Sequence, residues 1–175
     1  MAEKTLSETF IRDVENGLVA LLAPLVDAGF EVGYLPEEKT GIDAAILPKK
    51  PRLWASYRES TVDKEMDYLT GVGNNLAQCE ILHFDVVILA RGRRTDTGTY
   101  LVMNAARSLL IGQEPAPGAT ALKFTGQRLE EFEEAGVWRY SVSFTTDTYI
   151  VADVLSEETG PAITALIGKW LQESE

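Results

Sequence analysis

The sequence predicts an α+β domain in which helices pack on a mostly antiparallel sheet of about four to five strands. In three segments, apolar residues recur at three- and four-residue steps, which is the period of an amphipathic helix. In five other segments, apolar and polar residues tend to alternate, which is the period of a strand with one buried face. The predicted order is helix, three strands, helix, two strands and helix, which is typical of an α+β fold.

The first helix is predicted over residues 6–25, after a Thr-x-x-Glu capping box that begins at Thr5. Pro24 should bend or end its last turn, and Gly29 suits the position just past a helix end. Gly17 should cost about 1 kcal/mol relative to alanine. The apolar stripe consists of Leu6, Phe10, Val14, Leu18, Leu21, Leu22 and Leu25.

Three strands are expected next, over residues 30–35, 52–60 and 81–94. Residues 61–78 are polar and have no clear period, so we expect a protruding loop there. The third strand, ILHFDVVILARGRR, should bury one face and carry a second face that is polar at one end and apolar at the other. The buried face consists of Leu82, Phe84, Val86, Ile88 and Ala90, and the second face consists of His83, Asp85, Val87 and Leu89.

A second helix should follow, capped by Thr95, Asp96 or Thr97 and stopped by Gly112 and Pro115. Its expected buried stripe is Val102, Ala105, Ala106, Leu109 and Leu110.

Residues 121–134 and 136–146 predict a hairpin, in which Gly126 marks a bulge. A third helix is predicted from Pro161 onward. We therefore expect one domain over residues 1–147 and an extension over 148–175, whose helix packs on the same domain or on a neighbouring subunit. The apolar stripe of that helix consists of Ile163, Leu166, Ile167, Trp170 and Leu171.

Composition favours a soluble protein made in the cytoplasm. The chain has 175 residues, a single cysteine, Cys79, and no apolar run of the roughly 20 residues that span a membrane. Its N-terminal residues lack the pattern of a secretory signal. The formal net charge is -11, so we expect no tight binding to nucleic acid, although Arg91, Arg93 and Arg94 form a local basic patch.

The sequence contains no strong catalytic, metal-binding or cofactor motif. His83 is the only histidine, and it lies about 6 to 7 Å from Asp85 along the strand, which is too far for direct orientation. One cysteine and one histidine exclude a structural zinc site. GVGNN, at residues 71–75, lacks the third glycine of a dinucleotide-binding loop. The acidic run at residues 130–134 is interpreted as a solvated strand edge.

Several segments carry a family resemblance. AARSLLIGQEP, ALKF and LEEFEEAGVWRYSVSFTT, together with PRLWASYRES and HFDVVILARGRR, resemble the tail terminators of Mu-like contractile-tailed phages. The resemblance covers residues 1–147. It implies a fold like that of lambdoid tail terminators and a homohexameric ring that caps the tail tube. The ring would stop tube polymerisation at the head-proximal end of the tail, present a surface to the neck or connector, and meet the sheath, without chemistry or cofactor.

The expected interface residues are Arg91, Arg93 and Arg94 opposite Glu130 and Glu131 of another copy, because ring contacts join two different patches. Arg52 and Trp170 are further candidates. Reversing the charge of the three clustered arginines should weaken assembly and leave folding intact. Two alternatives remain: another head–tail joining protein, such as a neck or tail-completion component, and a cytosolic enzyme that uses His83 and Asp85.

Overall fold

The computed structural model describes residues 9–36, 50–70, 75–94, 98–133 and 137–151. The chain divides into two compact units, one formed by Met1–Val62 and Glu80–Thr148 and the other by Asp63–Cys79 and Tyr149–Glu175. The capping box at Thr5 and the predicted third helix lie outside the described residues. The predicted domain boundary after residue 147 stays a prediction.

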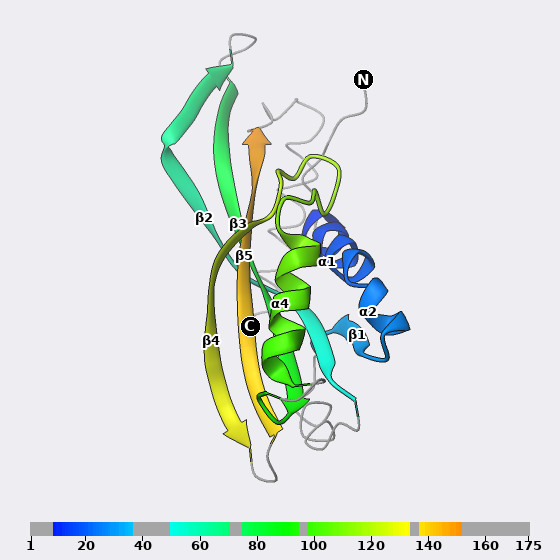
Figure 1. Ribbon diagram of the computed structural model, residues 1–175. Helices are drawn as coiled ribbons and strands as arrows, with labels where there is room; N and C mark the ends of the chain where they lie inside the picture. The colour runs from blue at the N-terminus through cyan, green and yellow to red at the C-terminus, as the bar shows by residue number, and fades with distance from the viewer. Residues whose placement is uncertain (1–8, 37–49, 71–74, 95–97, 134–136, 152–175) are drawn as a thin grey trace, which may run out of the picture. The chain divides into compact units, whose positions relative to one another are not determined.

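The α+β prediction is confirmed. Five strands form one sheet in the order β1-β2-β3-β5-β4, and Figure 1 shows α1, α2 and α4 on the same side of it. β1 pairs with β2 in parallel, and β4 pairs with β5 in antiparallel orientation. The helices are α1 (Thr9–Leu21), α2 (Pro24–Asp27) and α4 (Thr99–Leu110); the strands are β1 (Glu31–Tyr34), β2 (Arg52–Thr70), β3 (Asn75–Arg91), β4 (Lys123–Glu133) and β5 (Val137–Val151).

The main core lies between the helices and one face of the sheet. The predicted faces of the 81–94 strand are confirmed, because its even-numbered residues 82–88 join this core. Val87 and Leu89, on the other face, join a second cluster with Trp54 and Val137. β3 is therefore apolar on both faces toward its end. Residues that β5 and the helices bury in the main core are Phe10, Val14, Leu18, Leu25, Val102, Met103, Ala106, Leu110, Tyr140, Val142 and Phe144.

Two local predictions are wrong. Residues 61–70 continue β2, and β3 already begins at Asn75, so no long loop joins them. A connection of four residues joins strands only in antiparallel orientation, and backbone hydrogen bonds can extend such a hairpin without an apolar face. The N-cap of α4 is Gly98, which makes no side-chain cap hydrogen bond. The carbonyls of Gly92 and Arg93 instead accept from the N–H groups of Thr99 and Tyr100.

Other local predictions are confirmed. α1 ends before Pro24, and Gly29 and Gly112 adopt positive φ angles of 91° and 81° after their helices. Gly126 follows a bulge, because Phe124 pairs with Phe144 whereas Gly126 pairs with Ser143. Gly17 has a role that sequence reasoning missed. A Cβ built on it would lie 1.7 Å from the carbonyl oxygen of Pro115.

Gly17→Ala is therefore expected to lower the free energy of unfolding by about 2 kcal/mol or more, despite the better helix propensity of alanine. The added methyl would force α1 and the Pro115 backbone apart. Urea unfolding measures the change. Gly33→Ala is the matched control, since a Cβ there meets nothing within 4 Å. An unchanged midpoint for Gly17→Ala would contradict this close approach.

Candidate functional site

A polar network lies on the face of the sheet opposite the main core. Asp85 on β3 is buried, and its Oδ1 accepts a hydrogen bond of 2.6 Å from the Ser143 hydroxyl on β5. Its Oδ2 lies 4.0 Å from a guanidinium nitrogen of Arg128 on β4. Arg128 also donates to Glu130 at 2.6 Å, and the Ser141 hydroxyl donates to the same carboxylate at 2.6 Å. The network joins three neighbouring strands and pairs each carboxylate with a donor.

The network changes the pKa values of two groups. Burial alone would raise the pKa of Glu130, but hydrogen bonds from Ser141 and Arg128 and the charges of Arg128 and Arg139 outweigh it and lower that pKa. The hydrogen bond to Glu130 and its negative charge raise the pKa of Arg128. Both groups therefore stay charged around neutral pH.

His83 and Asp85 do not work as a pair in the described structure. The Nε2 atom of His83 lies 3.2 Å from the hydroxyl of Thr61 on β2, whereas Asp85 faces Ser143 on the opposite neighbouring strand. Their side chains thus bond in opposite directions across the sheet. Among the described residues, no group of three or more histidine, cysteine or acidic side chains could hold a metal ion. The described helices include none long and apolar enough to cross a membrane.

The three arginines after β3 have different environments. Arg91 and Arg94 are exposed, whereas Arg93 is half-buried. The guanidinium carbon of Arg93 lies 4.5 Å from the centre of a Trp138 ring and 5.3 Å from that of Tyr100. Such cation–π contacts stabilise the fold. The predicted reversal of all three charges would therefore disturb folding through Arg93. Only Arg91 and Arg94 can be changed to test the surface charge without loss of these ring contacts.

Other predicted interface residues have partners within the chain or lie outside the described part. Arg52 forms an ion pair with Glu31, its cross-strand neighbour on β1. Glu130 accepts hydrogen bonds from Arg128 and Ser141, and it lies at a second bulge, between Leu129 and Glu131. The backbone of Glu131 pairs with Arg139, and Trp170 lies outside the described residues. β4 is the edge strand of the described sheet, as expected for the acidic run.

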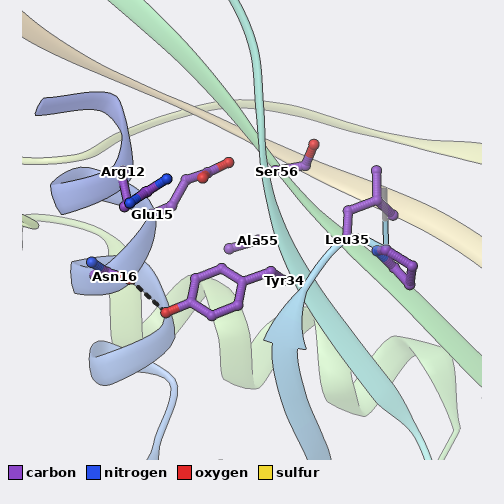
Figure 2. A pocket seen from close by; sticks show the side chains of 8 residues that line it. Arg12, Glu15, Asn16, Tyr34, Leu35, Ala55 and Ser56 are labelled. Carbon is purple, nitrogen blue, oxygen red and sulfur yellow. Dashed lines mark hydrogen bonds between the residues drawn. The ribbon is translucent and has the colours of Figure 1, made fainter. Parts of the chain in front are cut away.

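Two of the grooves lined by described residues lie beside helices α1 and α4. The first, of about 730 Å³, lies beside α1 where β1 ends (Figure 2). There the hydroxyl of Tyr34 donates to Asn16 at 2.6 Å, and Glu15 accepts from the backbone N–H of Tyr57 at 2.7 Å. The Glu15 carboxylate thus accepts a hydrogen bond from a backbone N–H of β2 at a position that lies beyond the pairing of β2 with β1. Arg12 and Ser56 also line this groove.

The second groove, of about 470 Å³, lies between α4 and β4. α4 contributes Tyr100 and Asn104, β4 contributes Gln127, Arg128 and Leu129, and Arg93 lines the same groove. The Nε atom of Arg93 is buried and has no hydrogen-bond partner. We call this cavity the α4–β4 groove. Its polar lining includes the amides of Asn104 and Gln127 and the side chain of Arg93, whereas the guanidinium of Arg128 binds Glu130 on the opposite face of the sheet.

Sequence reasoning identified Arg93 but missed Arg128, Tyr100 and Asn104. Arg128 stands beside the acidic run, and its position opposite Ser141 follows from the predicted hairpin once the bulge is placed. The approach of α4 to β4 depends on tertiary packing, which no short-range pattern in the sequence encodes.

The fold and these surfaces define a small α+β domain with polar and cationic grooves along a mixed sheet. The family model described as "Gp37 protein" matches residues 19–167, so the chain belongs to the Gp37 family. Among solved structures, a chain titled "Virion of native gene transfer agent (GTA) particle" matches at 15% identity with a TM-score of 0.44. That match covers 76% of this chain and 84% of the other. No curated protein matches.

Glu130→Gln should make stability less dependent on pH. A carboxyl group with a lowered pKa stabilises the fold above its unfolded-state pKa of about 4.3, and this contribution is lost as pH falls through the lower folded-state value. We expect the variant to be less stable than the native chain at pH 7, by less than about 1 kcal/mol, because this pair is partly exposed.

The difference between the two chains should be smaller at pH 3, because the contribution of the Glu130 carboxylate declines as pH falls below the unfolded-state pKa. Urea unfolding at both pH values measures it, with Glu59→Gln as a control on an exposed glutamate whose ion-pair partner is the adjacent Arg58. A difference that stays constant across this pH range would refute the role assigned to the Glu130 carboxylate.

Proposed function

We propose that this Gp37-family protein is a structural protein of a phage-like virion, and that it acts as the tail terminator. The observation that supports this role is the place of the resembling segments in the fold. The segments that resemble Mu-like tail terminators form parts of β2, β3, α4, β4 and β5. These elements belong to an α+β fold, which is the fold class that the resemblance implies. In this role, copies form a hexameric ring on the end of the tail tube and present a surface to the neck.

The surfaces of the described residues are compatible with a ring. A ring contact joins one patch to a different patch on the next copy. The described sheet has two unlike edges, with β1 at one and β4 at the other. The cationic α4–β4 groove lies beside β4, and six copies would carry 6 × -11 = -66 formal charges. Such a ring would not bind DNA tightly, which suits a channel that DNA must traverse.

A non-catalytic role is part of the proposal. His83 and Asp85 bond to different neighbouring strands, so their geometry offers no base oriented by an acid. His83→Ala should leave assembly unchanged, because the imidazole contacts the hydroxyl of the exposed Thr61, at 3.2 Å, within its own chain. Loss of assembly in this variant would instead give the histidine a functional role.

The ring is tested by native mass spectrometry and electron microscopy of the purified protein, alone and with tail tubes. We expect six copies per particle, seated at tube ends. A chain that stays monomeric at high concentration and does not bind tube ends would contradict the proposal. Binding to the neck connector without binding to tubes would assign the protein to head–tail joining instead.

The exposed arginines allow a charge test within the same assay. Arg91→Glu with Arg94→Glu should keep the fold, because both side chains are exposed, and should raise the protein concentration needed for rings by about tenfold or more. Arg12→Glu with Arg58→Glu is a matched control, since both residues are exposed and the change in charge is equal. Equal effects of the two double variants would show that net charge, not this patch, matters.

A further inference from the structure

We propose that Glu15 closes one edge of the sheet against strand addition by a second copy of this chain. Its carboxylate accepts a hydrogen bond from a backbone N–H of β2 that an added strand would need, so the contact is autoinhibitory. The inference does not depend on the proposed function, because it concerns the sheet edge at β1 whether or not copies form a ring.

β2 extends beyond its outer neighbour. β1 has four residues, and its pairing with β2 ends where Tyr34 faces Ala55, whereas β2 continues to Thr70. β1 is the edge strand of the described sheet on this side, and residues 59–62 of β2 are exposed. A sheet edge with unpaired backbone groups is a template on which another chain can add a strand. The end of β1 is therefore the point at which this edge needs protection.

The backbone hydrogen bonds show where the pairing of β1 with β2 stops. The N–H of Leu35 donates to the carbonyl of Ala55 at 3.1 Å. In a regular parallel ladder, the N–H of Tyr57 would next donate to the carbonyl of Leu35. It donates instead to Oε1 of Glu15 at 2.7 Å. The Glu15 carboxylate thus takes the place of a strand carbonyl at the first position beyond β1.

Neighbouring residues position this carboxylate. Asn16, which follows Glu15 on α1, accepts a hydrogen bond of 2.6 Å from the hydroxyl of Tyr34, so the helix is tied to the end of β1. Figure 2 shows the Glu15 side chain extending from α1 toward β2. Pro36 follows β1 and lacks the N–H that a further strand beside β1 would require. The adjoining groove of about 730 Å³ leaves room for an incoming strand, so loss of the carboxylate would open the edge.

Glu15→Ala removes the acceptor. In dilute solution we expect the amide hydrogen of Tyr57 to exchange about tenfold or more faster than in the native chain. At higher concentration the variant should form larger assemblies than the native chain does, and the Tyr57 amide should regain protection within them. Analytical ultracentrifugation and hydrogen–deuterium exchange at single-residue resolution measure these effects.

Two variants on the same helix are the controls. Glu15→Gln keeps an acceptor oxygen on a side chain of the same length, so it should assemble as the native chain does. Asp13→Ala also removes one negative charge, from an exposed position of α1, and should not produce larger assemblies. Larger assemblies of Asp13→Ala equal to those of Glu15→Ala would show that net charge, not the edge contact, controls association, and would overturn the proposal.

Loss of stability is tested separately. Gly17→Ala is expected to destabilise the chain while the Glu15 carboxylate stays in place, so equal association of Gly17→Ala and Glu15→Ala would refute edge closure. If Glu15→Ala fails to fold, Glu15→Asp tests the same contact, because its shorter side chain keeps the charge and withdraws the acceptor from Tyr57. A folded Glu15→Ala or Glu15→Asp chain that assembles only as the native chain does would likewise refute it.

The assembly of the native chain separates this inference from the proposed function. Native rings that form while the Glu15 variants add no larger assemblies would overturn edge closure and leave the terminator proposal standing. Larger assemblies of the variants, with Tyr57 protected inside them, support edge closure even if the native chain never forms rings or binds tubes.

Discussion

The burial of β3 on both faces is the constraint on which the rest of the structure depends. Residues 86–90 are all buried, and the side chains of residues 86–89 contribute alternately to the main core and to the cluster around Trp54. A central strand of this kind needs a neighbour on each side for its backbone hydrogen bonds and a layer on each face. β2 and β5 supply the neighbours, and the helices supply one layer. A polar substitution in this strand would leave a buried group without a partner.

The end of β3 connects this core to the candidate surface. Gly92 adopts a positive φ of 69°, and its carbonyl accepts hydrogen bonds from both the backbone and the hydroxyl of Thr99. The next carbonyl, of Arg93, accepts from Tyr100, so the turn itself satisfies N–H groups at the start of α4. The same turn brings Arg93 next to the Tyr100 ring. The position of the guanidinium group is therefore fixed by backbone geometry as well as by its aromatic neighbours.

Sequence periodicity predicted the parts of the fold where burial determines the conformation. The two faces of β3, the stripe of α1 and the β4–β5 hairpin all follow from which side chains avoid water. Periodicity failed for residues 61–70, because this segment continues β2 although its sequence is polar and shows no clear strand period. It also missed the role of Gly17, since the approach of Pro115 comes from a segment far along the chain. For the same reason Arg93 could be identified as a candidate from the sequence, whereas its aromatic partners and the Asn104 side of the groove could not.

The overall charge determines which kind of contact can hold copies of this protein together. With a net charge of -11, two copies repel each other at long range, and salt at physiological strength screens this repulsion over about 8 Å. Attraction must then come from local pairs of unlike patches that meet at contact distance. Arg93 suits such a contact because its aromatic neighbours fix it in place, whereas Arg91 and Arg94 must lose side-chain freedom before they bind. A contact that is weak for each pair can still close a ring, because each subunit in a closed ring is held by two neighbours.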